Sequence, residues 1–231
     1  MGFNEKVHAF IAAKYYVCLT ETFGERGKAA FIHATQYYAE QRGRRMAQRA
    51  IRDGKKLDFE NYSRYGEWVS TEEIAAQGCQ NVSKVVSQTP DRVIQIVQCP
   101  WHAQFKEMGL CATAGAEYCK HLDNSIARGF NPYLTYEVEQ TLHTAPYCIH
   151  RMKDAGIDET SDLSRDPKNM RSFEYHCAHS YWAYSEVTRA IFGGEGENVC
   201  RKVLADFRDE YGDAMADAIA RYEGVNFNVC G

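Results

Sequence analysis

A cysteine and a histidine lie three residues apart in Cys99-Pro100-Trp101-His102. Proline favours the first turn of a helix, so we expect Cys99 at a helix N-terminus. The positive end of a helix dipole lowers the pKa of a thiol, and His102 is within reach to take or give the proton. The pattern is typical of an activated cysteine nucleophile. It is also half of a metal site, and a buried cysteine beside a capping histidine is the alternative without chemistry.

A second cysteine lies one helical turn before a carboxylate. Cys119 and Asp123 are four residues apart in a stretch that reads as a helix, so both lie on one face. Asp123 could orient a base or bind a cationic, amidine-like group. The plain alternative is an ordinary helix with its cysteine inside and its aspartate in water.

Further histidines and cysteines extend this set. His143 and Cys148 lie across an expected hairpin turn, and His176 and His179 are three residues apart on one helix face. Two histidines on one face suit a metal pair or an acid/base pair. A single histidine there is more often a satisfied core or surface residue.

Arginines supply possible anchors for an anion. Arg128 precedes a helix stop, and its planar fork suits a carboxylate, while the nearby Asn131 side chain is free to form hydrogen bonds. An arginine stripe at helical spacing usually marks a solvated face, or else a funnel for an anionic substrate. This stripe consists of Arg42, Arg45, Arg49 and Arg52.

Composition narrows the function classes. The 231 residues carry 27 basic and 31 acidic side chains, a formal net charge of -4. Such a balance gives no electrostatic case for binding nucleic acid or an anionic membrane. No apolar run is long enough to span a membrane, and the first residues carry no apolar signal segment. The 9 cysteines are therefore expected to be reduced thiols of a cytoplasmic protein.

Periodicity predicts helices at both ends and strands in the middle. We expect helices over 3–22, 25–52, 101–108, 113–128, 173–192 and 195–222. A hairpin of 81–88 and 92–99 surrounds the turn Thr89-Pro90-Asp91, and 133–142 pairs with 147–152. The segment 68–77 reads as another strand.

The first and last helix pairs look like copies of one helical hairpin. Phe192-Gly193 follows Phe23-Gly24 by 169 residues, and the same offset joins Tyr15 to Tyr184. We predict one α+β domain, 1–231, in which a central antiparallel sheet is flanked by helical hairpins. Its parts are the N-terminal hairpin (1–55), the sheet with helices (65–155) and the C-terminal hairpin (173–223).

The motif order resembles the L-2-amino-thiazoline-4-carboxylic acid hydrolase family. The resemblance rests on the Cys99–His102 segment, Tyr118-Cys119 with Asp123, Arg128 to Pro132, Leu142-His143 with Cys148, and His176 to His179. Early segments, Arg42 to Met46 and Tyr65 to Trp68, also fit. The family implies opening of a cyclic, amidine-like thiazoline by water, giving an N-carbamoyl-cysteine type of product. More loosely, the central part is similar to a vinyl-reductase-like, ligand-binding domain.

The leading hypothesis is therefore a hydrolase that acts on a C–N or C=N bond of a small carboxylated ring. Cys99 or Cys119 would attack the amidine carbon, and His102 would move protons. The predicted catalytic residues are Cys99, His102, Cys119, Asp123, His176 and His179. The predicted substrate-binding residues are Glu67, Trp101, Arg128, Asn131, His143 and Cys148.

Two other functions stay open. The same cysteines and histidines are soft ligands suited to zinc or iron, although we expect no cofactor and assign no metal ligand. A small-molecule sensor without turnover is the other alternative. The expected partner is a small-molecule substrate, with no nucleic acid and no membrane, and helix pairs at both ends are compatible with a homodimer.

Overall fold

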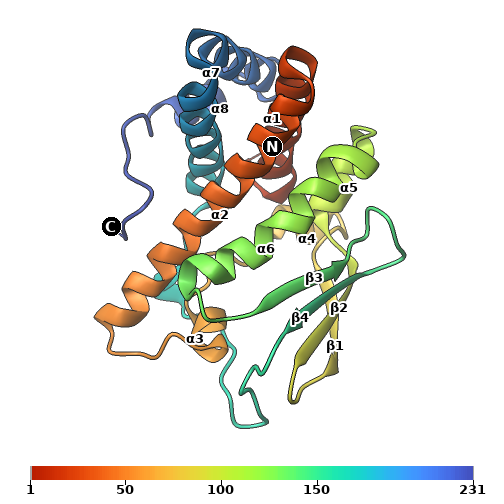
Figure 1. Ribbon diagram of the computed structural model, residues 1–231, viewed down its shortest axis with the longest axis vertical. Helices are drawn as coiled ribbons and strands as arrows, with labels where there is room; N and C mark the ends of the chain where they lie inside the picture. The colour runs from red at the N-terminus through yellow and green to blue at the C-terminus, as the bar shows by residue number, and fades with distance from the viewer. Residues whose placement is uncertain (1, 231) are drawn as a thin grey trace.

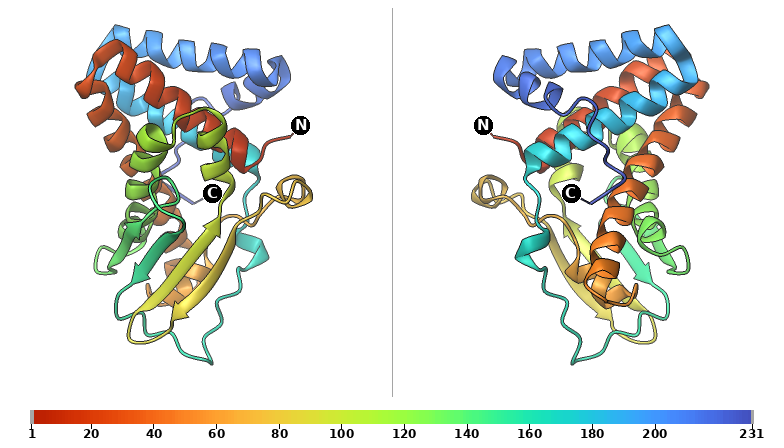
Figure 2. Two further views of the ribbon diagram at one scale, coloured as in Figure 1. Left: turned by 90° about the vertical axis from the view of Figure 1, so that its right-hand side faces the viewer. Right: turned by 90° about the vertical axis from the view of Figure 1, so that its left-hand side faces the viewer.

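A computed structural model describes residues 2–230 of the chain (Figure 1). It combines helices with a four-stranded antiparallel sheet, which confirms the predicted α+β class. The two views of Figure 2 show the first and last helices at one end and the strands at the other, with the helix of residues 25–52 (orange) reaching from the first to the second. The largest hydrophobic core joins residues of the first, middle and last segments.

The N-terminal hairpin consists of α1 (Glu5–Phe23) and α2 (Glu25–Arg52). Asn4 caps α1, because its side chain accepts hydrogen bonds from the backbone N–H groups of Lys6 and Val7. The predicted helix 25–52 is confirmed at both ends.

The C-terminal helices repeat the geometry of the N-terminal pair. α7 (Phe173–Tyr211) is interrupted at Gly193 and is followed by α8 (Asp213–Ala220). Gly193 (φ 57°, ψ -129°) and Gly24 (φ 57°, ψ -132°) share one backbone conformation, which favours glycine because φ is positive. Phe23 and Phe192 stack with their ring centroids 3.7 Å apart. The repeat expected from the sequence is therefore a repeat of structure.

Strands β1 (Val82–Ser87), β2 (Arg92–Gln98), β3 (Tyr136–Gln140) and β4 (Cys148–Met152) form the sheet, in the order β1-β2-β4-β3. Both predicted hairpins are confirmed, and β2 pairs with β4 to join them. Successive side chains of a strand face opposite sides of a sheet. One face therefore carries Ile94 and Ile96 from β2 together with Cys148, His150 and Met152 from β4.

Between the hairpins lie α5 (Pro100–Glu107), a π-helical turn η1 (Cys111–Gly115) and α6 (Ala116–Phe130). α6 packs along α2 at very close range. A Cβ on Gly43 of α2 would lie 2.1 Å from the Ile126 carbonyl oxygen, and a Cβ on Gly129 would lie 2.4 Å from the Glu40 carbonyl oxygen. These glycines let the two helices touch and thereby bring their side chains to one cavity.

The segment 68–77 is not a strand, so that prediction is wrong. It contains the short helix α4 (Glu72–Ala76), whose cap is Thr71. The Thr71 hydroxyl accepts from the Ile74 N–H and itself donates to the buried Glu5 carboxylate. This long-range contact anchors the turn, and the residues before it are extended without strand partners.

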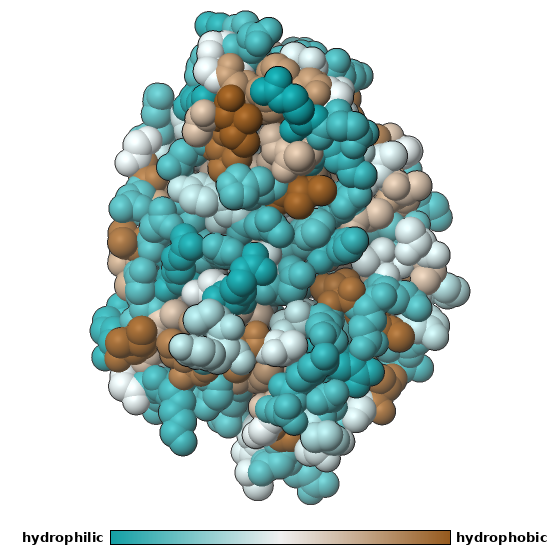
Figure 3. Space-filling model, in the orientation of Figure 1, coloured by the Kyte–Doolittle hydropathy of each residue, from teal (hydrophilic) through white to brown (hydrophobic). Residues whose placement is uncertain are grey.

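The remaining elements are short. α3 (Phe59–Arg64) follows α2, and a 3-10 turn η2 (Pro167–Asn169) interrupts the long connection from β4 to α7. Among the described residues, none of the helices is long and apolar enough to cross a membrane. Figure 3 shows one face of the molecule, where apolar side chains gather only in small groups among hydrophilic ones.

Candidate functional site

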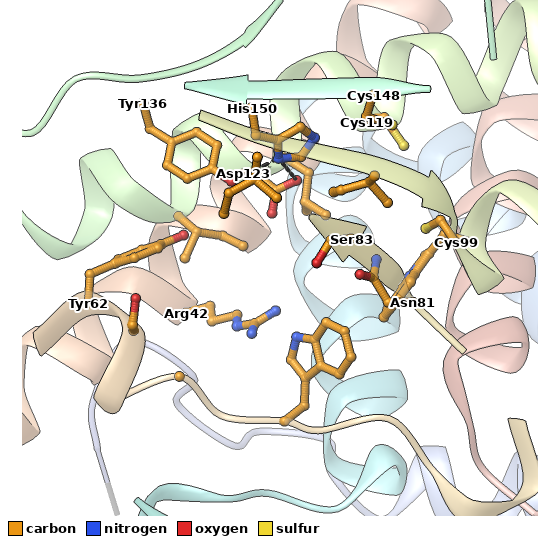
Figure 4. A pocket seen from close by; sticks show the side chains of 18 of the residues that line it. Arg42, Tyr62, Asn81, Ser83, Cys99, Cys119, Asp123, Tyr136, Cys148 and His150 are labelled. Atoms are coloured by element: carbon orange, nitrogen blue, oxygen red, sulfur yellow. Dashed lines mark hydrogen bonds and ion pairs between the residues drawn. The ribbon is translucent and has the colours of Figure 1, made fainter. Parts of the chain in front are cut away.

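A cavity of about 480 Å³ lies between the inner face of the sheet and helices α2, α3 and α6. Its volume falls in the range of small-molecule sites. Figure 4 shows polar side chains entering it from several elements, among them Arg42 from α2 and Asp123 from α6. The walls are otherwise largely aromatic and aliphatic.

Arg42 is a buried cation without a counterion. It is 8% exposed, and it forms no hydrogen bond or ion pair with any residue between 2 and 230. Its guanidinium carbon lies 6.0 Å from the centre of the Trp68 ring. A buried charge is costly unless it is paired, and Arg42 lines the cavity, where an anion could reach it.

Arg165 brings a second guanidinium to the same aromatic ring, 5.7 Å from its centre. Burial of this group, followed by repulsion from Arg42, lowers the pKa of Arg165. Gly66 leaves room for it, because a Cβ there would lie 1.6 Å from Arg165 Nη1. The residue as a whole is exposed, yet its charged end reaches the cavity and has no ion-pair partner in the described chain. The two arginines thus line one side of the cavity.

A carboxylate lies in another wall. Asp123 Oδ2 is 3.9 Å from His150 Nδ1, and the Tyr136 hydroxyl shares a 2.8 Å hydrogen bond with the same nitrogen. The Asp123 side chain is 33% exposed, so the cavity admits water or a ligand to it. The cavity therefore offers both a carboxylate and guanidinium groups to a small ligand.

Cys99, Cys119 and Cys148 line the cavity. Burial raises the pKa of each thiol, that of Cys99 to about 12. The backbone N–H groups of His102 and Trp101 act in the opposite direction on Cys99, as expected at a helix N-terminus. The predicted low pKa of Cys99 is therefore wrong, because desolvation outweighs the helix end.

Trp101 is part of a buried hydrogen-bond chain in the cavity wall. Its indole Nε1 donates to His8 Nδ1 over 3.0 Å, and His8 Nε2 lies 2.9 Å from the Tyr38 hydroxyl. Burial lowers the pKa of His8 well below its usual value, so the ring is neutral. The chain fixes the orientation of Trp101, whose ring lies 5.0 Å from that of Trp68, the ring that the two arginines face.

His102 and His143 do not line this cavity. They lie behind Cys119, whose Sγ is 3.3 Å from His143 Nε2. Burial lowers the pKa of His143 to about 4 and also lowers the pKa of His102. One donor atom from each of His102, Cys111 and His143 lies within 4.8 Å of the other two, which makes this group a candidate metal centre.

Glu67 lies in the protein core, outside the cavity. It is fully buried and accepts from Arg45 Nη2 at 2.7 Å and Arg49 Nη2 at 2.8 Å. Burial alone would raise the pKa of Glu67, but attraction to Arg45 outweighs it and lowers the pKa to about 2. Its predicted role in substrate binding is thus replaced by an ion-pair role. The arginine stripe is likewise not a solvated face, because Arg42, Arg45 and Arg49 are buried.

His176 and His179 belong to the same buried network. His176 Nε2 lies 3.2 Å from the Glu67 carbonyl oxygen, and His179 Nε2 lies 2.8 Å from Gln41 Oε1. Burial lowers the pKa of both rings, that of His176 to about 3. Neither ring lines the cavity. These two predicted catalytic residues therefore lie apart from Cys99, Cys119 and Asp123, which do line it.

Arg128 and Asn131 also lie away from the cavity. Arg128 is exposed and pairs with Glu40 of α2 at 2.8 Å. The Asn131 amide donates to the Leu57 carbonyl oxygen, so it ties the end of α6 to the chain after α2. Of the predicted site residues, the cavity thus brings together Cys99, Trp101, Cys119, Asp123 and Cys148.

Several cavity residues escaped the sequence-based prediction. His150 follows Cys148 by two positions on a strand, so alternation alone could have placed it on the same face. Arg165 comes from an irregular connection. Cys111, which does not line the cavity but lies with His102 and His143, comes from a π-helical turn. Neither segment has a period that predicts which way a side chain points.

The sequence profile of the L-2-amino-thiazoline-4-carboxylic acid hydrolase family matches residues 4–148. This match covers more than half of the chain. The chain belongs to this family. The family name is that of a hydrolase, and the matched region includes Arg42, Cys99, Cys119 and Asp123, whereas His150 and Arg165 follow it. Searches of curated proteins and of solved structures returned no match.

Proposed function

We propose that this protein hydrolyses a small carboxylated 2-amino-thiazoline, or a closely related cyclic amidine, in the cavity. The observation that carries the proposal is the unpaired, buried guanidinium of Arg42, with Arg165 beside it over one tryptophan ring. Guanidinium groups match the planar geometry of a carboxylate. The carboxylate of the substrate would supply the missing counterion.

The other end of the substrate matches Asp123. A protonated 2-amino-thiazoline is a planar cation with N–H groups along one edge, and a carboxylate can accept two such hydrogen bonds. Asp123 stays open to the cavity, with His150 and Tyr136 fixing its surroundings. The cavity thus complements a ligand that carries one negative and one positive group.

Cys99 is the nucleophile that we favour. Its thiol lines the cavity at the N-terminus of α5. In the first step Cys99 transfers its proton to Asp123, and the sulfur forms a bond to the amidine carbon across its C=N bond. The ring C–S bond then breaks, and the departing sulfur takes the proton held by Asp123. The enzyme is left with an isothiourea on Cys99, in which the former amidine carbon is bonded to the Cys99 sulfur and to both nitrogens.

Water completes the reaction. It adds to the same carbon, the bond to Cys99 breaks, and the thiol regains a proton as the carbon becomes a carbonyl. The product keeps both C–N bonds of the former amidine as a carbamoyl group on nitrogen. The bond that breaks in the ring is therefore C–S, and this proposal replaces the C–N cleavage first expected from the sequence.

Because the pKa of Cys99 is raised, we propose that its thiol becomes reactive only when substrate is bound. At rest the thiol is protonated, because burial raises its pKa to about 12. A cation bound next to a thiol favours the thiolate. The bound amidinium would thus activate its own nucleophile, and the empty site would stay unreactive.

Product analysis tests the proposal. Purified protein incubated with L-2-amino-thiazoline-4-carboxylic acid should form a carbamoyl product that mass spectrometry detects. The Cys99→Ser variant should lose on the order of a hundredfold or more in rate, as for loss of an activated nucleophile, and Asp123→Asn should also lose activity. Cys79→Ser, outside the cavity, should behave like the native protein. Full activity of Cys99→Ser would replace the covalent route by direct attack of water.

Ligand binding without turnover is the second candidate function. It is favoured by one observation, namely that the pKa of every thiol lining the cavity is raised. Tight binding of the same acid with no product would support this function and contradict the first.

A further inference from the structure

Histidine and cysteine side chains lie close together behind the cavity wall that carries the three cysteines, away from Arg42, Arg165 and Asp123. We propose that His102, Cys111 and His143 bind a zinc ion, with Cys119 as the fourth ligand. The site would join α5, the π-helical turn η1, the start of α6 and the loop before β4. The proposal concerns metal binding and does not rest on the proposed hydrolysis.

The distances suit a tetrahedral ion. Around zinc, with bonds of about 2.0 Å to nitrogen and 2.3 Å to sulfur, neighbouring donor atoms lie roughly 3.3 to 3.8 Å apart. The donors of His102, Cys111 and His143 already lie within 4.8 Å of one another. The two imidazole rings meet edge to face, with centroids 5.0 Å apart. Side-chain rotations would have to bring these three donors to bonding distance of one ion.

Cys119 is placed to act as the fourth ligand of the ion. Its Sγ is 3.3 Å from His143 Nε2, which is already the separation expected for two donors on one zinc ion. On a bound zinc ion both sulfurs, those of Cys111 and Cys119, would be thiolates.

The backbone around the cluster is shaped for His143. A Cβ on Gly115 would lie 2.4 Å from His143 Cε1 and 2.5 Å from Nδ1, so this glycine holds a space for the ring. The π-helical turn that begins at Cys111 is a rare element, frequently found at functional sites. These features are independent of the donor distances.

The donor chemistry selects the metal. Two imidazoles and two thiolates form an N2S2 set, which suits zinc, whereas magnesium and calcium require oxygen ligands. Four protein ligands would leave no open position, so the ion would brace the wall behind the cavity. Cys119 would then be unavailable as a nucleophile, which leaves that role to Cys99.

Metal content tests the proposal. The whole protein is stripped with a chelator, titrated with Zn²⁺ alone, and analysed for bound metal after dialysis. We expect one zinc per chain, and at least a tenfold loss of affinity in His102→Gln and in Cys111→Ser. His33→Ala and Cys79→Ser, which change the same residue types elsewhere, should bind like the native chain. Far-UV circular dichroism confirms that each variant is folded.

Cobalt provides a second, spectroscopic measurement. Co²⁺ in the same site should show a thiolate-to-metal charge-transfer band that weakens in Cys111→Ser and again in the double variant with Cys119→Ser. Absence of bound zinc in the native chain, or zinc that both single variants retain at unchanged affinity, would overturn the proposal. A cobalt spectrum without the thiolate band would overturn it as well.

Discussion

At the residue scale, two buried arginines on one helix have opposite surroundings. Arg45 of α2 is paired with Glu67, while Arg42, three positions earlier, has no counterion. A pair that loses one partner leaves a buried charge, which costs about 3–5 kcal/mol, whereas removal of an unpaired buried charge removes a cost. The same substitution should therefore have opposite effects at the two positions.

We predict that Arg45→Met lowers the free energy of unfolding by about 3–5 kcal/mol. Arg42→Met should leave it unchanged or raise it, while ligand binding is lost. Urea denaturation of both variants measures this difference. Equal destabilisation of the two variants would mean that Arg42 has a structural partner of its own and is not held for a ligand.

Glu67 gives the protein a defined acid sensitivity. Its folded-state pKa of about 2 lies below the ordinary value of 4.5. Its contribution to stability is thus complete above about pH 4.5 and is lost as the pH falls from there towards 2, on the order of 3 kcal/mol in all. Chemical denaturation at a series of pH values should show this loss.

Glu67→Gln is the matched variant for that measurement. It should be less stable at neutral pH, because Arg45 and Arg49 lose their shared counterion. It should also lose this part of the acid dependence. A variant whose stability falls with acid as steeply as that of the native chain would assign the effect to other carboxylates.

At the element scale, the close crossing of α2 and α6 sets the cavity. Gly43→Ala would place a Cβ 2.1 Å from the Ile126 carbonyl oxygen, so the helices must separate. Overpacking of this kind costs about 1–3 kcal/mol, and the shift should weaken substrate binding as well. Gly194→Ala is the control, because nothing lies within 4 Å of its Cβ and it should be neutral or stabilising. Thermal unfolding compares the two variants. An unchanged unfolding temperature in Gly43→Ala would show that α2 and α6 are not closely packed at this position.

The elements themselves were largely predictable from local signals. Helical periodicity and the glycine stops gave α1, α2 and the break at Gly193, and β-branched runs around Thr89-Pro90-Asp91 gave the first hairpin. The predicted single helix 195–222 is wrong, because Gly212, with a positive φ of 85°, separates α7 from α8. The failure at 68–77 is instructive, because Thr71 acts as a helix cap whose geometry depends on Glu5, far away in the chain. Local pattern does not contain that contact.

At the scale of the whole molecule, the cavity depends on contacts that no local pattern predicts. Cys99 and Asp123 were identified from their residue types and spacing, and they do share the cavity. The arginine stripe was recognised, but burial of most of its members follows from packing of α6 and α7 against α2. Arg165 arrives from an irregular connection, and its role follows only from the folded chain.

The repeated helical pairs were likewise predicted from the sequence, but the contacts between them were not. The 169-residue offset predicted equivalent hairpins, and Gly24 and Gly193 do share one conformation. The sequence did not indicate that Phe23 and Phe192 would stack on each other. Nor did it separate the buried network of Glu67, His176 and His179 from the cavity, because buried ion pairs and catalytic groups use the same residue types.

The central claim is that the paired guanidiniums select a carboxylated substrate. The most direct measurement compares kcat/KM for L-2-amino-thiazoline-4-carboxylic acid with that for 2-amino-thiazoline, which lacks the carboxylate, in the native chain and in Arg42→Met. We predict a strong preference for the acid in the native chain, at least a hundredfold, which corresponds to about 2.7 kcal/mol. Most of this preference should disappear in Arg42→Met. An equal preference in both proteins would contradict the account.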